Sequence, residues 1–313
     1  MEPAQIPGRV VVTGGAGFIG THTVRRLLDL GIETLVIDDF RHACPEPVPK
    51  TVTLLRADIA APAARRALLE FRPHAIIHLA AQGGVNRSLK DPAADAIVNV
   101  VGTVALLRAA VDAQCPRFVF ASSGGAIYGR ARRLPSREAD QAKPLSPYGA
   151  AKLACEGYLG MFSRTFGVHF VALRYGNVYG PFQDGTGEAG LVAITANRLL
   201  QGKAPQITGD GGQTRDFTYV ADVAAANIAA LTTRFQGALN IGTGLATSVT
   251  EVVTTLAGLA GFQGRAEHLD GRPGEVRSNY LSPARAARHL SWEAQVTLAD
   301  GLATTYQSFA GVS

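Results

Sequence analysis

A glycine-rich turn near the start of the sequence leaves few folds open to this chain. The β-branched run RVVVT (residues 9–13) predicts a strand, and the spacing of apolar residues up to Leu30 predicts a helix. Between them stands GGAGFIG, residues 14–20. Its glycines allow a sharp turn that brings the backbone close to a pyrophosphate at a helix N-terminus. We expect a dinucleotide held by Gly14, Gly17, Phe18, Ile19 and Gly20; a turn without a ligand is the alternative.

An acidic residue follows the second predicted strand, residues 33–37. A carboxylate in this position accepts hydrogen bonds from the adenosine ribose hydroxyls and repels a 2′-phosphate. We therefore assign Asp38 to the ribose and predict NAD as the cofactor rather than NADP. Arg41 is a counter-signal, because a guanidinium could meet that phosphate, and we interpret Asp39 as a solvated loop residue.

Strands and helices alternate through the first half of the chain. Strands are expected near residues 10–13, 33–37, 52–56, 75–79 and 117–121, with helical stretches between them. This alternation predicts an α/β fold of the Rossmann type, a doubly wound parallel sheet with helices on both faces. Cofactors lie at the carboxyl ends of such strands. The predicted cofactor residues after these strands are Asp58, Ile59, Leu79, Ala80, Ala81, Gln82, Asn99 and Ser122.

Two of these positions have alternative interpretations, and the neighbouring His78 is interpreted as structural. Asp58 could reach the adenine amino group or could cap the next helix. His78, at the end of the fourth strand, is interpreted as a packed strand residue. Asn99 stands in a helix whose other residues at the same spacing belong to the core, although Asn99 itself can face the cofactor.

Residues 146–152, SPYGAAK, predict a helix start that carries a catalytic pair. Ser146 suits the N-cap, Pro147 suits the first helical position, and Tyr148 and Lys152 then lie on one face, four residues apart. An ammonium beside a phenol favours the phenolate, so we expect the lysine to lower the tyrosine pKa. Such a pair can take a proton from a sugar or alcohol hydroxyl. A solvated surface pair is the alternative reading.

Ser122 and Ser123 end the fifth predicted strand and lead into GGAIYG, residues 124–129. Hydroxyl groups at the carboxyl end of a central strand lie where a substrate is expected. The alternative is a turn whose serines bond only to their own backbone. We therefore add Ser123 to Tyr148 and Lys152 as a catalytic residue.

The second half of the chain has a different pattern. A buried strand at residues 168–174 leads into YGNVYGP, and from about residue 180 glycine-rich loops and short strands dominate. We predict a dinucleotide-binding domain over residues 1–180, to which part of residues 216–245 returns. Residues 181–313 form mainly a smaller substrate-binding lobe.

Charge and cysteine content limit the classes of partner. The 313 residues carry a net charge of +5, yet the basic residues are dispersed, so we expect an anionic small substrate and no nucleic acid. Three cysteines without metal spacing, and scattered histidines, predict reduced thiols, a cytoplasmic protein and no metal site. We find no signal pattern and no apolar run near 18 residues, which predicts no membrane span.

These motifs together resemble the extended short-chain dehydrogenase/reductase superfamily. Within its NAD-dependent epimerase/dehydratase family, the chain is most similar to nucleotide-sugar 4-epimerases of the UDP-glucose 4-epimerase type. The similarity runs from residue 10 to about 285. It is carried by TGGAGFIG (13–20), HLAA (78–81), the Ser123, Tyr148 and Lys152 trio, RYGNVYGP (174–181), RDF (215–217) and RPGE (272–275).

The resemblance implies a tightly held NAD⁺ that oxidises the sugar at C4 and then returns the hydride to the other face of the rotated ketose. Tyr148 would take the hydroxyl proton, Ser123 would hold the 4-oxygen, and Lys152 would hold the nicotinamide ribose. The resemblance also implies a homodimer through the Tyr148 helix and the helix around residues 104–107. Further implied contacts are Tyr175 to the cofactor, Asn177 to the nucleotide-sugar, Arg215 and Arg272 to its diphosphate, and Glu275 to the nucleoside ribose.

Two departures from the family pattern stand out. In the common Ser-Ser-Ser-Ala-x-Val-Tyr-Gly form, the third serine aligns with Gly124, so the catalytic hydroxyl is assigned to Ser123. The Ala-Asp pair that usually follows the last arginine motif is Leu281-Ser282 here.

The loop after the serines bears on the choice of reaction. Related 4,6-dehydratases and decarboxylases carry acidic residues in this loop, whereas Gly124-Gly125-Ala126 holds no titratable group. Epimerisation is therefore preferred, with those two reactions as alternatives and a catalytically silent NAD-binding sensor or scaffold as a third. Asn279, at the position that limits space around the sugar C2 substituent, predicts room for 2-acetamido sugars.

Overall fold

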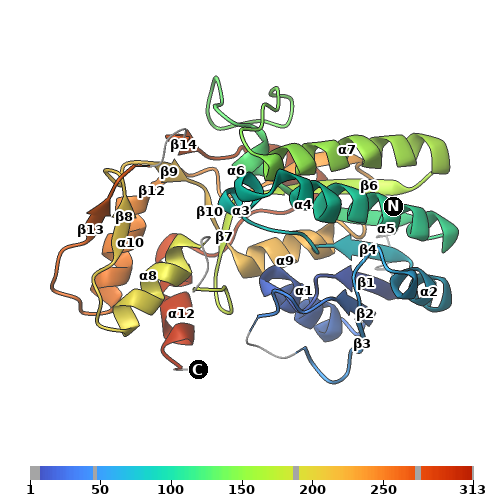
Figure 1. Ribbon diagram of the computed structural model, residues 1–313, viewed down its shortest axis with the longest axis horizontal. Helices are drawn as coiled ribbons and strands as arrows, with labels where there is room; N and C mark the ends of the chain where they lie inside the picture. The colour runs from blue at the N-terminus through green and yellow to red at the C-terminus, as the bar shows by residue number, and fades with distance from the viewer. Residues whose placement is uncertain (1–7, 45–47, 186–189, 272–275, 312–313) are drawn as a thin grey trace.

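A seven-stranded parallel sheet forms the centre of the computed structural model, which describes residues 8–44, 48–185, 190–271 and 276–311 (Figure 1). The strand order is β11-β6-β5-β4-β1-β2-β3. Their bounds are β1 Arg9–Thr13, β2 Glu33–Asp38, β3 Thr53–Arg56, β4 Ala75–His78, β5 Arg117–Ser123, β6 His169–Tyr175 and β11 Gly237–Ile241. The order reverses at β1, which pairs with β2 on one side and β4 on the other. The predicted Rossmann-type fold is confirmed.

Helices cover both faces of this sheet, which explains the unbroken apolar run in β1. Val10 and Val12 pack in the core beneath α1 (Phe18–Asp29) and α9 (Val220–Ala229). Val11 packs on the opposite face with α2 (Pro62–Phe71), α5 (Gly102–Asp112) and α7 (Pro147–Phe166). Successive strand residues point to opposite faces, so a strand buried on both sides needs apolar residues at every position.

A helical run follows β4 and crosses the face covered by α7. It comprises α3 (Val85–Lys90), α4 (Pro92–Ala96), the π-helical turn η1 (Ile97–Val101) and α5. Contrary to expectation, the stretch from Pro92 to Asp112 is long and apolar enough to cross a membrane, judged by length and composition alone. However, 44% of its most apolar window is buried inside the protein, as in the core helix of a globular domain.

A second lobe begins after β6 and lies beyond the carboxyl ends of the strands (Figure 1). Its core packs α8 (Leu191–Leu200), α10 (Val249–Leu259) and α12 (Leu298–Phe309) against one another. Three small sheets complete the lobe. They pair β7 (Asn177–Tyr179) with β10 (Phe217–Tyr219), β8 (Gln206–Thr208) with β13 (Glu267–Leu269), and β9 (Thr214–Arg215) with both β12 (Thr247–Ser248) and β14 (Ser278–Asn279).

The chain returns to the main sheet from this lobe. After β10, helix α9 packs on α1, and β11 pairs with β6 as the edge strand. Two short helices stand where the lobe meets the sheet: α6 (Gly124–Ile127) directly follows β5, and α11 (Ala284–Leu290) packs against β11. The lobe is therefore connected to the end of the sheet at which the predicted site residues gather.

Candidate active site

The glycine turn is packed too closely for side chains. Gly14 has a φ of +70°, and a Cβ there would lie 2.6 Å from the backbone nitrogen of Ala80. A Cβ on Gly20 would overlap the carbonyl oxygen of Gly14 and lie 2.7 Å from the Cα of Gly15. Helix α1 begins after Gly17, which has no side chain to cap the first N–H groups. The turn thus offers open backbone donors at a helix N-terminus, which suits a pyrophosphate.

Asp38 fastens this turn to the end of β2. Its buried carboxylate accepts hydrogen bonds from the N–H groups of Ala16 (2.9 Å) and Phe40 (2.8 Å). Each carboxylate oxygen has a second lone pair, so these bonds leave acceptors for ribose hydroxyls. The assignment of Asp38 to the ribose stays a prediction, and the structure adds that Asp38 also shapes the turn.

Arg41 is held by two carboxylates. It lies 2.6 Å from Asp39 and 2.9 Å from Asp58, so Asp39 is an ion-pair partner rather than only a solvated loop residue. Asp58 also accepts the N–H of Ala60, and Ala61 stands at the N-cap of α2, so Asp58 is not the cap of that helix. A guanidinium paired twice is poorly placed to meet a 2′-phosphate, which favours NAD.

The end of β4 is fixed by a buried hydrogen-bonded chain. Thr103 donates its hydroxyl proton to the carbonyl of Asn99, so it accepts from His78 Nε2 (2.9 Å), while His78 Nδ1 accepts from Thr13 (2.7 Å). Burial lowers the pKa of His78 to about 3, which keeps the ring neutral. His78 is thus a packed strand residue, as expected.

Asn99 orients the segment after β4. Its Oδ1 accepts the N–H of Gln82, and its Nδ2 donates to the carbonyl of Gln82 and to the buried carboxylate of Asp95. Both amide protons are therefore used inside the protein. Asn99 acts on the predicted cofactor site through Gln82, and a direct contact with the cofactor stays a prediction. Leu79 and Ala80 lie beside Thr13 and Gly14, while Ile59 packs near Gly102.

Helix α7 starts as its sequence predicts, and it buries the lysine of the catalytic pair. Ser146 accepts the N–H of Gly149 (3.1 Å), Pro147 is the first helical residue, and Lys152 lies one turn after Tyr148. The Lys152 ammonium lies 5.7 Å from the centre of the Tyr148 ring and 4.8 Å from that of Phe120. Lys152 is only 3% exposed, so the alternative interpretation as a solvated surface pair is wrong.

The ionisation of this pair differs from the sequence-based expectation. Burial raises the pKa of Tyr148 to about 12, and a hydrogen bond with Ser123 opposes that rise. Burial also lowers the pKa of Lys152 to about 8. In the ligand-free protein the pKa of the phenol therefore lies above its ordinary value, because burial disfavours the charged phenolate, and the expected lowering by the lysine is not seen. Ser123 is the hydroxyl group that acts on the phenol pKa, which supports the choice of that serine.

Position 124 has no room for the missing serine. A Cβ on Gly124 would lie 2.5 Å from Leu281 Cδ1 and 3.1 Å from the carbonyl oxygen of Arg174. The two departures from the family pattern, glycine at position 124 and leucine at position 281, are thus in contact, and Leu281 fills the space beside Gly124. Asn279 secures the same loop, because its Nδ2 donates to the carbonyls of Gly125 (3.0 Å) and Gly124 (3.3 Å).

The predicted substrate residues converge from three strands. Arg215 and Asn279 face one another in the β9–β14 register, and Asn177 begins β7. A Cβ on Gly125 would lie 3.5 Å from Asn177 Oδ1 and 3.7 Å from Ser123 Oγ, so both side chains border this loop. Tyr175 donates its hydroxyl to Asn227 (2.5 Å), which ties that residue to α9. Arg272 and Glu275 lie outside the described residues.

A buried ion pair beneath the serines escaped the sequence analysis. Glu156 and Arg174 form a two-point contact at 2.6 and 2.9 Å, with side chains 11% and 8% exposed. Ser122 donates to the same Glu156 (2.6 Å), so its hydroxyl is directed at α7. This bond gives the Ser122 hydroxyl a structural role, and the predicted contact of Ser122 with the cofactor stays a prediction. One signal was present: Glu156 stands four residues after Lys152, on the same helix face.

Among the described residues, no group of three or more His, Cys, Asp or Glu side chains is gathered as a metal would need. The polar groups at this end of the sheet instead form two sets. One surrounds the glycine turn, and the other brings Tyr148, Ser123 and Lys152 together with Asn177. A dinucleotide across the first set would reach the second at the carboxyl ends of β4 and β5.

Comparison with known proteins agrees with this geometry. The sequence pattern of the NAD dependent epimerase/dehydratase family matches residues 10–242. A UDP-glucose 4-epimerase of Mycolicibacterium smegmatis is 41% identical over 307 residues, which cover 96% of this chain and 98% of that protein.

Two solved structures are similar over nearly their whole length. The UDP-glucose 4-epimerase of Thermotoga maritima, solved with UDP-glucose, has a TM-score of 0.95 at 38% identity, covering 97% of this chain and 99% of its own. The enzyme of the same name from Thermus thermophilus, in complex with NAD, has a TM-score of 0.91 at 41% identity, covering 97% and 100%.

Proposed function

Because the chain belongs to the NAD dependent epimerase/dehydratase family, we propose that it is an NAD-dependent nucleotide-sugar 4-epimerase that interconverts UDP-glucose and UDP-galactose. The observation that carries the proposal is the place of Tyr148 one helical turn before Lys152, whose ammonium lies 5.7 Å from the centre of the phenol ring, at the end of the sheet where Ser123 closes β5. We assign NAD binding to residues 1–180 with β11, and substrate binding mainly to residues 181–313.

The residues around the glycine turn fit NAD. The backbone of residues 14–20 would hold the pyrophosphate, Asp38 the adenosine ribose, and Lys152 the nicotinamide ribose. When bound, NAD⁺ supplies an acceptor for the C4 hydride and returns that hydride to the opposite face of the 4-keto sugar.

Tyr148 moves the proton that accompanies this hydride. Its phenolate oxygen takes the proton of the sugar C4 hydroxyl, and the same phenol returns it after the ketose has turned over in the site. Ser123 binds the same oxygen and keeps it in line with the phenol. A positive charge must lower the phenol pKa from about 12, and Lys152, with a pKa of about 8, is largely protonated at neutral pH.

The alternative reactions lack their acids and bases. Dehydration expels water from C5 and C6 and needs a further acid and base, yet the loop that follows Ser123 is Gly124-Gly125-Ala126. A side chain at Gly124 would also overlap the buried side chain of Leu281, which would have to move. A silent scaffold would not need Tyr148 and the buried Lys152, which are both in place.

A panel of nucleotide-sugars tests the proposal. We expect the purified protein to convert UDP-galactose to UDP-glucose, with the C4 stereochemistry read by NMR, and to release NAD(H) when denatured. Asn279 leaves space near the sugar C2 group, so UDP-GlcNAc is also expected to be converted to UDP-GalNAc. Turnover of the two hexoses without the acetamido sugars would reject only the assignment of Asn279. Released NAD(H) without conversion of any UDP-sugar would reject the epimerase.

We propose that the enzyme acts as a cytoplasmic homodimer through α7 and the η1–α5 run. Ile97 and Val101, 63% and 57% exposed, stand four residues apart on this run, and Tyr158 is exposed on α7. Three free cysteines suit a reducing compartment. Light scattering should give twice the chain mass for the wild type and for Leu259→Glu, a control in α10. Ile97→Glu with Val101→Glu should give one chain mass, and a wild-type monomer would contradict the dimer.

A further inference from the structure

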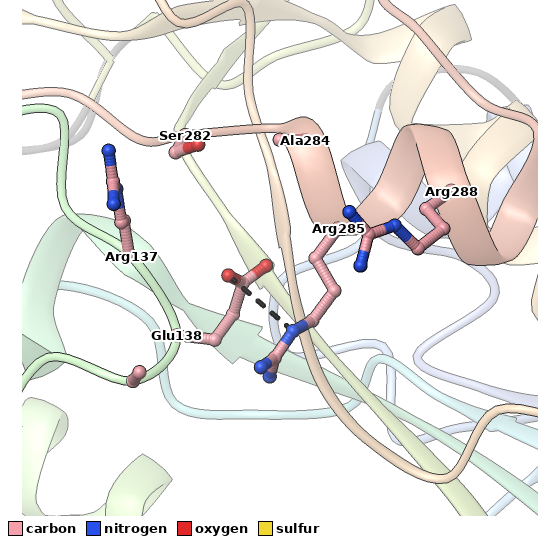
Figure 2. Close-up of a pocket in the computed structure, with 7 residues that line it drawn as sticks. Arg137, Glu138, Ser282, Ala284, Arg285 and Arg288 are labelled. Carbon is pink, nitrogen blue, oxygen red and sulfur yellow. Dashed lines mark ion pairs between the residues drawn. The ribbon is translucent and has the colours of Figure 1, made fainter.

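A cavity lined by arginines includes none of the predicted cofactor and substrate residues that the structure describes. It has a volume of about 280 Å³ and lies between the loop at Arg137–Ala139 and the start of α11 (Figure 2). Arg137, Arg285 and Arg288 line it, together with Glu138 and the hydroxyl of Ser282. Three arginines thus line one concavity together with a single glutamate.

That carboxylate is already engaged on its inner side. Glu138 is 6% exposed, and its Oε1 accepts the N–H of Asn240 in β11 (2.8 Å). Its Oε2 lies 4.0 Å from Arg285 Nε, which is a long and therefore weak ion-pair contact. Asp140, the other nearby acid, lies 3.3 Å from Arg133 and accepts the backbone N–H of Arg137 (2.7 Å). Positive charge therefore exceeds negative charge around the cavity.

The walls of the cavity are fixed before any ligand arrives. Ser136 donates its N–H to the carbonyl of Tyr280, and Ser282 donates to the carbonyl of Ser136, both at 2.9 Å. These bonds join the two segments that carry the arginines. The floor is held by Arg174, which donates to the carbonyl of Glu138 (3.5 Å) and to Tyr128 (2.8 Å). A ligand here would not have to order the backbone of either wall.

We propose that this cavity is a second anion site, which binds the phosphate or diphosphate group of a small molecule. Guanidinium groups present planar pairs of donors that match phosphate oxygens, and several of them around one cavity select a multiply charged oxyanion. The Ser282 hydroxyl adds a neutral donor. The site is distinct from the predicted substrate site, because Asn177, Arg215 and Asn279 do not line it.

Calorimetric titration with inorganic pyrophosphate tests this site, with phosphate and acetate as further probes. We expect binding in the order pyrophosphate, phosphate, acetate. Arg285→Gln with Arg288→Gln should weaken pyrophosphate binding by about tenfold or more, because each charge-assisted hydrogen bond contributes substantially. The matched control, Arg66→Gln with Arg265→Gln, removes the same charge from exposed positions elsewhere and should bind as the wild type does.

The substrate diphosphate site is the competing destination for the probe. Arg215→Gln removes a predicted contact there and should leave the titration unchanged if pyrophosphate occupies the arginine cavity. Loss of binding in Arg215→Gln, or wild-type binding in the Arg285 and Arg288 double variant, would overturn the proposal. Thermal melting confirms that each variant is folded, and Arg285→Lys with Arg288→Lys keeps the charge should the glutamine variant unfold. The titration does not depend on epimerase activity, so it stands or falls separately from the proposed function.

Discussion

Tyr148→Phe is expected to lower turnover of UDP-galactose by about 10²–10⁴-fold while the protein keeps its bound NAD. The substitution removes one oxygen atom, the atom that accepts the C4 proton. It keeps the ring beside Lys152, and helix α7 begins at Ser146 through a bond that does not involve the phenol. The measurement is kcat by NMR, together with the NAD(H) released per chain on denaturation. Tyr306→Phe, in α12 of the second lobe, is the control and should retain full activity.

The pH dependence of Lys152→Met separates an electrostatic role from a structural one. Burial places the Tyr148 pKa at about 12, so the phenolate becomes more abundant as the pH rises toward that value. Turnover near neutral pH requires the ammonium to lower this pKa in the enzyme loaded with NAD and sugar. The variant should be slow at pH 7 and should recover part of its activity as the pH increases. A loss of equal size at every pH would mean that Lys152 acts only by binding or packing.

Local sequence rules were sufficient for the elements that carry the site. Ser146 and Pro147 predicted the start of α7 because capping and the missing proline N–H are decided within one turn. The run of three valines in β1 predicted a strand, and the structure buries that strand on both faces. The succession of strand, glycine turn and helix then predicted a cofactor at the carboxyl ends of the strands.

Interactions between distant segments were beyond those rules. Glu156 and Arg174 meet only because α7 crosses β6, and their contact decides where the Ser122 hydroxyl points. The pKa of Tyr148 was expected to fall and instead rises, because burial by the surrounding fold is invisible in a four-residue spacing. Asn99 lies in a π-helical turn, and its side-chain amide accepts the N–H of Gln82. This contact depends on the tertiary structure and could not be predicted from the local sequence.

Gly20→Ala should remove the bound NAD and lower the stability of the fold by about 1–3 kcal/mol or more. The added methyl group would overlap the carbonyl oxygen of Gly14 and lie 2.7 Å from the Cα of Gly15. Both neighbours are backbone atoms, so no side chain can rotate to make room. Helix α1 must then move away from the turn that presents its first N–H groups to the pyrophosphate. NAD(H) per chain and the thermal midpoint measure the two effects.

A second helical glycine shows whether the effect comes from this close approach. Gly258 stands in α10, and among the described residues no atom of another segment lies within 4 Å of a Cβ built there. Gly258→Ala should therefore keep its NAD. Its free energy of unfolding should stay unchanged or rise by at most about 0.5–1 kcal/mol, since alanine suits a helix better than glycine. If Gly20→Ala also kept one NAD per chain, the cofactor would not depend on the helix N-terminus. The dinucleotide would then have to be held by Asp38 and Lys152 instead.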